Sequence, residues 1–337
     1  MATINDVAKL AGVSPTTAKR ALNEPHKLQP HTLEKVQWAI RELDYEPDLT
    51  AGALRRGRNM TVGLLVADIV EPFFAELARE VSVRLRSSNY GLLLADNEYQ
   101  SEIELHNLRH LAGQRVSALI MRPSYGPGNR EYLLKMQDKG TYIIEIDHHM
   151  PDSPFDFLML DHEQSVRAGL EHLWSLGHTR IAGLGTYDAE LYPEWRAHHF
   201  DHIMREHGHP VLSAYREIIR YNEQDAYEFT RYLLNLPERP TALFAFNGTE
   251  AIGAYRAIQD AGLRIAEDVS LLAFDNLPWT HMVSPGIDVI EQPIKQMGEL
   301  LVQQVLKNID GPRTPMQLLL PGKLIVRGSC GMASAES

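Results

Sequence analysis

Hydrophobic and polar positions follow two different periods along this chain, and the change falls near Met60. Before it, apolar residues recur at helical spacing in short segments. In TINDVAKLAG, for example, Ile4, Val7 and Leu10 fall on one face of a helix. After it, continuous apolar runs of strand length alternate with amphipathic helices, which is typical of parallel strands covered on both faces. The pattern therefore predicts an all-α N-terminal segment followed by an α/β body.

The N-terminal segment predicts two helices joined by a tight turn. Thr3 is expected to cap the first helix and Gly12 to end it. Ser14 is expected to cap the second helix, with Pro15 in its first position. So short a separation is the spacing of a helix-turn-helix. A third helix is predicted over PHTLEKVQWAIRELDY, with Thr32 as its N-cap.

The remainder of the chain contains more predicted strands than one sheet of the usual size holds. The predicted strands are 61–69, 91–97, 116–123, 141–147, 157–162, 180–185, 217–221, 241–247 and 269–276. Amphipathic helices such as 102–115 and 248–261 lie between them. The predicted fold is therefore an N-terminal all-α helix-turn-helix headpiece plus an α/β body of two doubly wound parallel-sheet subdomains.

The distribution of charge separates the same two regions. The 337 residues carry a net charge of −11, which by itself argues against a nucleic-acid partner. Residues 1–60 hold nine Lys and Arg against seven Asp and Glu, a balance of +2, whereas the rest holds 24 against 37, a balance of −13. A mildly basic front end on an acidic body suits an appended nucleic-acid-binding arm.

The cysteine count and the apolar runs indicate the compartment. A single cysteine, Cys330, excludes an intramolecular disulfide and fits a reducing environment. The N-terminus has no apolar signal-peptide core, and no apolar run approaches the ~18 residues that span a bilayer. We therefore expect a soluble cytoplasmic protein with no membrane partner.

The segment VSPTTAKRALN predicts a helix with almost nothing large and apolar to bury. Short polar side chains followed by Lys19 and Arg20, after a tight turn, fit a recognition helix that contacts base edges and phosphates in a major groove. A solvated surface helix without a partner is the alternative, because short helix-turn-helix patterns also recur by chance.

Several segments, in order, resemble the LacI/GalR (lactose repressor-like) family of bacterial transcription regulators. They are TINDVAKLAGVSPTTAKRALN, LEKVQWAIRELDYEPD, AGALRRGRNMTVGLLV, EPFFAELAREV, EHLWSLGHTRIAGLG, RPTALFAFNGTEAIGAYRAIQDAGLRIAEDVSLLAFDN and IEQPIKQMGELLV. The resemblance runs from residue 2 to about residue 328. It implies a ligand-responsive, sequence-specific transcription regulator, a repressor, that binds double-stranded operator DNA as a homodimer and needs no cofactor.

The resemblance also implies how the chain divides. It implies a DNA-binding headpiece at 1–46, a hinge helix or linker at 47–59, an effector-binding and dimerisation core of periplasmic-binding-protein type at 60–329, and a disordered tail at 330–337. Within the core, it implies one subdomain at about 60–160 and 290–319 and another at about 161–289 and 320–329.

Matched residue by residue, the family's motif implies the DNA contacts. Pro15 and Thr16 fall at the two variable positions that choose bases, and Arg20 falls at the conserved reader position. Thr17 and Asn23 fall at positions that usually touch phosphate. The full implied set is Thr3, Ser14, Pro15, Thr16, Thr17, Lys19, Arg20, Asn23, Leu54 and Arg55.

Two residues of this helix depart from the family's pattern. Ala18 replaces the usual valine, and Lys19 replaces the usual serine, so that Lys19 adds either a phosphate contact or a base contact. Pro15 has no backbone donor, so any direct readout there must be apolar, as against a thymine methyl group.

The segment PDLTAGALRRG resembles the family's hinge helix, which has few apolar anchors and is expected to fold only in the DNA-bound dimer. Leu54 matches the leucine that wedges between central base pairs in the minor groove. Its alternative role is that of a packing residue. Arg55, Arg56 and Arg58 would lie near phosphates and contribute salt dependence.

Ligands of doubly wound folds bind beyond the carboxyl ends of the strands, where this sequence places several polar and aromatic residues. By resemblance, Asp275 accepts hydrogen bonds from effector hydroxyls, Arg196 donates to the effector, and Tyr221 stacks on it. The predicted effector-binding set is Phe73, Phe74, Arg122, Asp161, Arg196, Tyr221, Asn247 and Asp275. We expect a small-molecule effector, a sugar or sugar derivative, with a purine as the alternative.

Each of these residues also has a structural interpretation. The two phenylalanines are alternatively core residues, Arg196 and Asp275 alternatively form a structural ion pair, and Asp161 and Asn247 alternatively cap the helices that follow them. His199 stands where the family usually has glycine, which puts the geometry around Arg196 in doubt.

The sequence offers little support for a metal site or for catalysis. His198 and His202 are four apart, but without a cysteine or a close carboxylate the spacing is unspecific, and a solvated face is the preferred interpretation. The chain has no GxSxG, P-loop, HExxH or CxxC motif, so we do not expect an enzyme. The remaining alternative is a small-molecule-binding or catalytic domain with an unrelated helical N-terminus.

Overall fold

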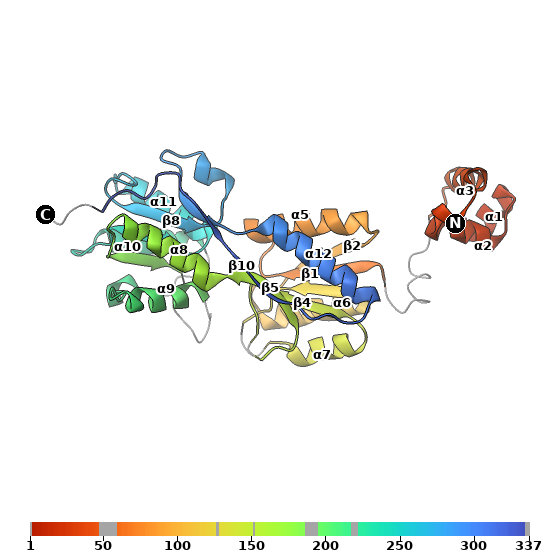
Figure 1. Ribbon diagram of the computed structural model, residues 1–337, viewed down its shortest axis with the longest axis horizontal. Coiled ribbons are helices and arrows are strands. Elements are labelled where there is room, and N and C mark those ends of the chain that lie inside the picture. Colours follow the sequence, from red (N-terminus) through yellow and green to blue (C-terminus); the bar gives the residue numbers. More distant parts are fainter. Residues whose placement is uncertain are drawn as a thin grey trace. The chain divides into compact units, whose positions relative to one another are not determined.

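The computed structural model describes residues 2–46, 59–125, 128–150, 152–185, 195–216 and 222–333. The chain forms two compact units, Met1–Asn59, which contains the predicted headpiece, and Met60–Ser337, which we call the body (Figure 1). Among the described residues, no helix combines the length and the apolar character needed to cross a membrane.

The headpiece is built from short helices packed around one small core. α1 (Ile4–Ala11) and α2 (Pro15–Asn23) are joined by a tight turn, and the 3-10 helix η1 (Pro25–Lys27) leads to α3 (Pro30–Glu42). The buried core consists of small residues from all three α-helices: Val7, Ala8, Ala11, Ala18, Ala21, Val36 and Ala39. Small side chains at these positions allow the helices to approach one another closely. The predicted helix-turn-helix is therefore confirmed.

The predicted caps of the first two helices are present. Thr3 Oγ1 accepts the Asp6 amide at 3.4 Å while the Asp6 carboxylate accepts the Thr3 amide at 2.8 Å, which makes a reciprocal capping box. Gly12 ends α1 with a φ of 66°, the left-handed conformation that glycine adopts without steric cost. Ser14 Oγ accepts the Thr17 amide at 3.1 Å and so caps α2.

The start of α3 differs from the prediction. The helix begins at Pro30, with Gln29 as the residue before it, so Thr32 is not its N-cap. The Thr32 amide instead donates to the Gln29 carbonyl at 2.9 Å within the first turn. Proline favours the first helical position because its φ is already set and no partner for an N–H is needed there.

The first sheet of the body is entirely parallel. In spatial order its strands are β10 (Gln317–Pro321), β5 (Asp156–Asp161), β4 (Tyr142–Ile146), β3 (Ala118–Met121), β1 (Thr61–Val66) and β2 (Gly91–Asp96). The central strands are buried along their length, as the continuous apolar runs predict.

The second sheet is parallel apart from one edge. In spatial order its strands are β11 (Lys323–Ile325), β9 (Asp288–Glu291), β8 (Ser270–Phe274), β7 (Ala242–Ala245) and β6 (Ile181–Leu184). β11 pairs with β9 in the antiparallel direction. Strands β9, β10 and β11 were not predicted, and the predicted strand 217–221 lies outside the described residues.

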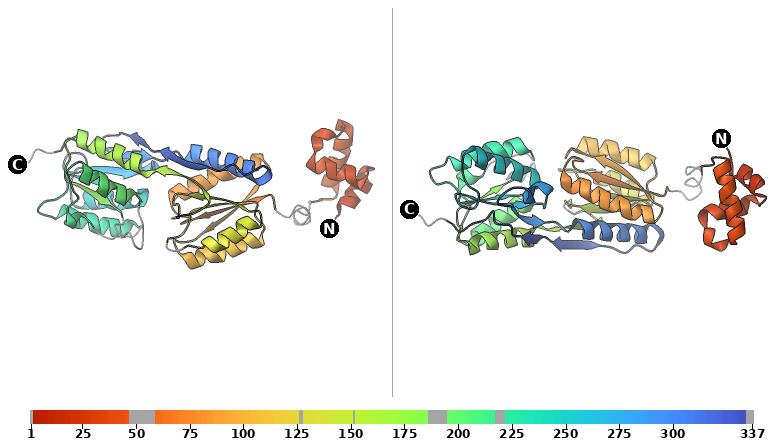
Figure 2. Two further views of the ribbon diagram at one scale, coloured as in Figure 1. Left: turned by 60° about the horizontal axis from the view of Figure 1, so that its bottom comes forward. Right: turned by 90° about the horizontal axis from the view of Figure 1, so that it is seen from above.

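Helices cover the two sheets in packed pairs (Figure 2). We call the first sheet with its helices the first lobe, and the second sheet with its helices the second lobe. In the first lobe, the pairs are α5 (Pro72–Ser87) with α12 (Ile294–Asp310) on one face and α6 (Ser101–Gly113) with α7 (Arg130–Asp138) on the other. In the second lobe, the pairs are α8 (His162–Ser175) with α9 (Trp195–Glu206) and α10 (Glu223–Leu234) with α11 (Gly248–Asp260). Two 3-10 helices, η2 (Ser213–Tyr215) and η3 (Pro278–His281), lie in loops of the second lobe. The predicted arrangement of two doubly wound subdomains is confirmed.

The chain passes between the two lobes at three places. β5 ends at Asp161 in the first lobe, and α8 begins at His162 in the second. β9 of the second lobe is followed by α12 of the first, and β10 of the first lobe is followed by β11 of the second. These connections hold the two lobes side by side, with the carboxyl ends of parallel strands from each sheet near the junction.

The C-terminal segment is ordered further than predicted. Cys330 is buried, the Gly331 amide donates to Ser270 Oγ at 3.0 Å, and the Ala333 amide donates to the Leu176 carbonyl at 2.8 Å. The expectation of a disordered tail from residue 330 is therefore wrong for residues 330–333. These residues find hydrogen-bond partners in the second lobe, which their weakly patterned side chains did not indicate.

Candidate functional site

One side of α2 is exposed and polar, while the other is buried. Ala18 is 0% exposed and packs in the headpiece core, whereas Pro15, Thr16, Lys19 and Arg20 are exposed. Alanine in place of the family's valine therefore affects the packing of the core rather than the exposed side. The exposed side carries the side-chain types that contact base edges and phosphates.

Arg20 lies next to a small network of exposed charges. Its Nε lies 3.9 Å from Glu24 Oε2, and Glu24 Oε1 also accepts Lys27 Nζ at 2.7 Å. The Lys27 hydrogen bond holds the pKa of the Glu24 carboxyl below its ordinary value. Exposed ion pairs of this kind are weak in water. Arg20 can therefore exchange Glu24 for a stronger partner such as a base edge.

The remaining predicted DNA contacts in the headpiece are hydroxyl groups engaged in the caps. The Thr3 hydroxyl donates to Asp6 Oδ2 at 2.7 Å, and the Ser14 and Thr17 hydroxyls share a hydrogen bond of 2.9 Å. These side chains fix the N-terminal ends of α1 and α2. Outside the described part of the structure lie the Asn23 side chain and Leu54, Arg55, Arg56 and Arg58.

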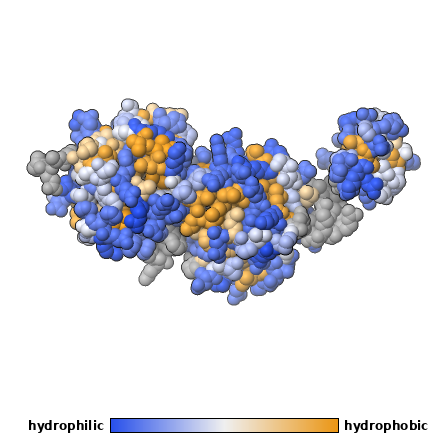
Figure 3. Space-filling view, viewed as in Figure 1, coloured by the Kyte–Doolittle hydropathy of each residue, from blue (hydrophilic) through white to orange (hydrophobic). Residues whose placement is uncertain are grey.

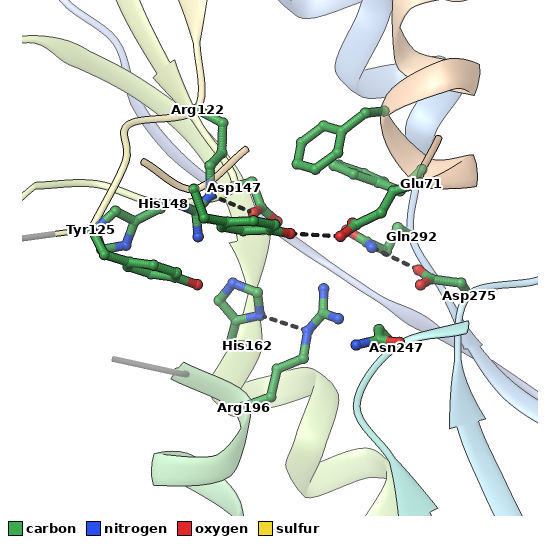
Figure 4. Close-up of a pocket in the computed structure, with 13 residues that line it drawn as sticks. Glu71, Arg122, Tyr125, Asp147, His148, His162, Arg196, Asn247, Asp275 and Gln292 are labelled. Atoms are coloured by element: carbon green, nitrogen blue, oxygen red, sulfur yellow. Dashed lines mark hydrogen bonds and ion pairs between the residues drawn. The ribbon is translucent and has the colours of Figure 1, made fainter. Parts of the chain in front are cut away.

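The body has a pocket between its lobes (Figure 4). It is lined by Glu71, Phe73, Phe74, Tyr99, Arg122, Tyr125, Asp147, His148, His162, Arg196, Asn247, Asp275 and Gln292. Most of these follow the carboxyl end of a strand or stand at the start of a helix, where a doubly wound fold binds its ligands. Six of the eight predicted effector-binding residues line it: Phe73, Phe74, Arg122, Arg196, Asn247 and Asp275.

Asp275 follows β8 and is held by two neighbours. Its Oδ1 accepts Gln292 Nε2 at 2.7 Å, and its Oδ2 accepts the Gly248 amide at 3.1 Å. Its φ of 73° lies in the left-handed region, which turns the backbone sharply at the end of the strand. A carboxylate with both oxygens fixed in place is preorganised to accept further hydrogen bonds from a ligand.

Arg196 projects from α9 into the pocket and is 7% exposed. Its Nε donates to His162 Nδ1 at 3.3 Å, and its Nη1 donates to the Phe246 carbonyl. The guanidinium carbon also lies 4.3 Å from the centre of the Phe274 ring. Burial, and secondly the Arg196 charge, hold the pKa of His162 well below its ordinary value, so His162 is neutral.

Arg122 occupies the corresponding place in the first lobe and is 2% exposed. Its Nη1 donates to the Pro123 carbonyl at 2.6 Å, and its Nε lies 3.4 Å from Asp147 Oδ2. The guanidinium carbon lies 4.1 Å from the ring centre of Tyr125 and 4.8 Å from that of Tyr99. These contacts fix the orientation of the guanidinium in the pocket wall.

Glu71 and Tyr99 line the pocket near the start of α5. The Tyr99 hydroxyl donates to Glu71 Oε1 at 2.6 Å. Burial raises the pKa of Glu71 to about 7, with the Tyr99 hydrogen bond opposing the shift and the Asp147 charge adding to it. Glu71 therefore takes up a proton near neutral pH.

The two interpretations of the predicted effector residues can now be compared. Phe73 and Phe74 line the pocket and also belong to the core of the first lobe, with their rings edge to face at 5.0 Å. Asn247 caps α11, accepting the Glu250 amide at 2.8 Å, and still lines the pocket. Core packing or capping therefore does not exclude a place at the site.

Asp161 is the exception, because it is not among the residues that line the pocket. Its Oδ1 accepts the Gln164 amide at 2.9 Å and caps α8, so the structure favours the capping role over ligand contact. The next residue, His162, lines the pocket instead. Tyr221 lies outside the described residues.

The sequence prediction missed seven lining residues, namely Glu71, Tyr99, Tyr125, Asp147, His148, His162 and Gln292. Two of them could have been found from the pattern, because Asp147 and His162 end the predicted strands 141–147 and 157–162. Gln292 follows β9, which was not predicted, and the two tyrosines stand in loops without a local signal.

One group of side chains in the described part of the structure is compact enough to hold a metal ion. The candidate ligand atoms of His172, Asp288 and Cys330 all lie within 4.8 Å of one another. His172 Nε2 lies 3.0 Å from Asp288 Oδ2, while Asp288 Oδ1 accepts the amides of Arg327 at 2.5 Å and Gly328 at 2.7 Å. This network fastens the C-terminal segment to the second lobe. The histidines singled out in the sequence, His198 and His202, are not part of this group.

A helix-turn-helix with an exposed polar helix, in one chain with a two-lobed body that holds a polar pocket, defines a class of protein. That class is the nucleic-acid-binding regulator that responds to a small molecule.

Comparison with known proteins agrees with this class. Residues 3–48 match "Bacterial regulatory proteins, lacI family", and residues 170–330 match "Periplasmic binding protein-like domain". The transcriptional repressor PurR of Aliivibrio fischeri strain MJ11 is 33% identical over 316 residues, which are 92% of each chain. The ribose operon repressor of Escherichia coli K12 is 28% identical over 335 residues, which are 98% of this chain and 100% of that protein.

A solved structure shows the same fold. The Lac repressor dimer bound to operator and the anti-inducer ONPF superimposes with a TM-score of 0.84 at 24% identity, covering 97% of this chain and 98% of that one. The chain belongs to the LacI family of bacterial regulatory proteins. It is therefore a DNA-binding transcription regulator with a ligand-binding body, and not an enzyme. The alternative of a binding or catalytic domain with an unrelated helical N-terminus is excluded.

Proposed function

We propose that this protein is a cytoplasmic repressor that binds a two-fold operator as a homodimer and is controlled by a sugar or sugar derivative bound between the lobes of the body. The observation that carries the proposal is the pocket itself. Buried charged and aromatic side chains from both lobes converge there, although burying charge is costly unless a partner compensates for it.

In the headpiece, α2 acts as the recognition helix. Pro15 and Thr16 choose bases, Arg20 reads a guanine edge, and Lys19 contacts a phosphate or a base. The exposure of all four side chains on one helix supports these roles. The caps at Thr3 and Ser14 present helix N-terminal ends, with Thr17 in the first turn, to the negatively charged backbone.

The roles of Asn23, Leu54 and Arg55 rest on the resemblance to the family. Asn23 contacts a phosphate, Leu54 wedges into the minor groove at the centre of the operator, and Arg55 contributes salt-dependent contacts. A leucine inserted between base pairs bends the DNA and allows both headpieces of a dimer to reach their half-sites.

The body supplies the dimer contacts. Large apolar side chains are exposed on the first lobe: Val83 at 53%, Leu93 at 38% and Leu94 at 39%. Leu93 and Leu94 lie on β2, an edge strand of the first sheet, and hydrophobic areas interrupt the hydrophilic surface in Figure 3. Exposed apolar residues at a sheet edge are expected to be covered by a partner. The solved relative with the same fold is a dimer bound to operator.

The pocket suits the hydroxyl groups of a sugar. Asp275 and Gln292 offer acceptors and donors already fixed in place, and the two buried arginines donate from opposite lobes. Phe73 offers an aromatic face to the apolar side of a sugar ring. A purine remains the second candidate, because the aromatic rings of Phe73 and Phe74 could equally stack on a base.

Regulation follows from contact with both lobes. A ligand that touches both stabilises one relative orientation of the lobes, and the dimer contacts carry that change to the hinge segments. The ligand can shift this equilibrium only by its differential affinity for the two orientations. The proposal therefore requires that ligand and operator affect each other's binding.

The test begins with selection of the operator from random duplex DNA by the full chain, followed by a gel shift. We expect a pseudo-palindromic site whose binding is lost on removal of residues 1–59 and altered by a ligand that also raises the melting temperature of the protein. A selected site without two-fold symmetry, or binding that survives removal of the headpiece, would contradict the proposal.

A further inference from the structure

Three side chains from distant parts of the chain converge in the second lobe. His172 lies on α8, Asp288 begins β9, and Cys330 lies in the C-terminal segment that follows β11. Their candidate ligand atoms all lie within 4.8 Å of one another. The three residues are not among those that line the pocket between the lobes, so this group is a second place at which the body brings chemically active side chains together.

Asp288 is held so that one carboxylate oxygen faces the other two side chains. Its Oδ1 accepts the amides of Arg327 at 2.5 Å, Gly328 at 2.7 Å and Ser329 at 3.3 Å. Its Oδ2 lies 3.0 Å from His172 Nε2. Backbone donors on one oxygen fix the orientation of the carboxylate, which is what the hydrogen bonds around metal ligands in proteins do.

The backbone on either side of Cys330 is also anchored. The Ser329 hydroxyl donates to the Leu271 carbonyl at 2.5 Å. On the other side, the Gly331 amide donates to Ser270 Oγ at 3.0 Å. Cys330 is therefore a buried residue in a fixed position beside Asp288, and not part of a loose tail.

We propose that His172, Asp288 and Cys330 bind one zinc ion through Nε2, Oδ2 and Sγ, and that the ion fastens the C-terminal segment to α8 and β9. Imidazole nitrogen, carboxylate oxygen and thiolate sulfur are the donors that zinc takes in proteins, in a tetrahedral arrangement. In the described part of the structure the group has three members, so a water molecule is the fourth ligand. The thiol proton leaves to solvent when the thiolate binds the ion.

The separation and the exposure of the three groups suit an ion that enters from solvent. Zinc–ligand bonds of about 2.0–2.3 Å place the ligand atoms of a tetrahedral site about 3.3–3.8 Å apart, which small side-chain shifts achieve here. The His172 side chain is 15% exposed, whereas that of Asp288 is 0% exposed. The ion and its water molecule therefore approach from the side of the imidazole.

A hydrogen-bonded network without an ion is the alternative, and two arguments favour the ion. A thiol is a weak hydrogen-bond donor but, as a thiolate, a preferred ligand of zinc. Zn²⁺ bound to one thiolate, one carboxylate, one neutral imidazole and one water also carries no net charge. The ion therefore compensates the charge of the buried Asp288 carboxylate, which is otherwise costly to bury.

A site with three protein ligands and one water should bind zinc exchangeably. The second lobe already has an extensive apolar core, so it should stay folded when the ion is removed. An ion that binds the native state and not the unfolded chain raises the melting temperature in proportion to the logarithm of its concentration above the Kd. The signature of the site is therefore a reversible, zinc-dependent gain in stability.

The experiment uses the full chain, freed of metal by a chelator and then titrated with zinc or with cobalt(II). We expect one equivalent of zinc to bind and to raise the melting temperature. Cobalt in the same site should give the intense visible bands of tetrahedral coordination and a thiolate-to-cobalt absorption in the near ultraviolet. Cys330 is the one cysteine of the sequence, so that absorption identifies the sulfur ligand without a variant.

Variants separate this site from unspecific binding by the chain's 15 histidines. Loss of a residue that only orients a metal ligand costs about 10–100-fold in affinity, so Cys330→Ser, which removes a ligand, should weaken zinc binding by at least about 100-fold. Asp288→Asn, which keeps an oxygen for the backbone amides, should also weaken it. The control is His106→Gln on α6, where the rings of His106 and His110 lie 4.6 Å apart, and it should leave zinc affinity unchanged.

Three outcomes would overturn the inference. They are an unaltered protein whose melting temperature does not respond to zinc, a cobalt spectrum without the thiolate absorption, and zinc affinity that is the same in Cys330→Ser. The last result would mean adventitious binding by surface histidines only. The cobalt titration is performed on the unaltered protein, so it decides the matter even if a variant fails to fold.

Discussion

The headpiece and the body handle their polar residues in opposite ways. On α2 the side chains of Thr16, Lys19 and Arg20 are exposed, whereas Arg122 and Arg196 in the pocket are 2% and 7% exposed. An exposed cation adds affinity for a polyanion through long-range, salt-sensitive attraction. A buried cation adds selectivity, because a ligand that leaves it unsatisfied pays the full cost of its desolvation. The exposed side of α2 therefore contributes affinity for many DNA sequences, whereas the pocket discriminates strongly between ligands.

The largest effect is expected at the buried site. Arg196→Met should reduce the affinity for the effector about 100-fold, or about 2.7 kcal/mol, because a charged donor inside the pocket is lost. Binding of the selected operator by the ligand-free protein should change little. Calorimetry with the effector and a gel shift without it measure the two effects.

The matched control for this change is an arginine on the surface of the same lobe. Arg167 on α8 pairs with Glu163 at 3.0 Å, and Arg167→Met should leave effector affinity unaltered. A folded Arg196→Met protein with normal effector affinity would contradict the claim that a buried cation in the pocket determines effector binding.

A smaller effect is expected at the exposed reader residue. Arg20→Ala should cost about 1–3 kcal/mol of specific binding and relax the preference at one base pair in each half-site. Repeating the selection from random DNA with the variant measures both quantities. Arg41→Ala, an exposed change on α3, is the control, and equal losses in the two variants would show that Arg20 contributes only charge.

The smallest effect is expected at Lys19, the residue that departs from the family's pattern. If it contacts a phosphate, Lys19→Ala should weaken binding to all sequences alike and reduce the slope of log affinity against log salt by about one. Titrations of specific and random duplexes at several salt concentrations measure this. A change in which base is preferred would assign Lys19 to base readout instead.

The same comparison explains what could be predicted from the sequence. In the headpiece, local chemistry determines the structure: Thr3, Gly12, Ser14 and Pro15 each mark a helix end, and these ends were found. In the body, Asp275 and Asn247 were found because each ends an apolar run, and the carboxyl ends of strands meet at one edge of a doubly wound sheet.

The missed residues depend on contacts between distant parts of the chain. Tyr99 and Tyr125 reach the pocket only because β2 and β3 place their loops beside Arg122. The order of residues 330–333 depends on buried partners such as Ser270 in β8. Neither periodicity nor composition reports such contacts, so these features could not be predicted from local pattern.

The central claim is that the pocket and the headpiece are energetically coupled, and calorimetry of the effector with and without the selected operator tests it most directly. If coupling exists, the operator must change effector affinity by the same factor by which the effector changes operator affinity, and factors of about 5 to 150 are typical. We expect two equal factors that differ from one. Effector affinity that is identical in the presence and absence of operator would contradict the account.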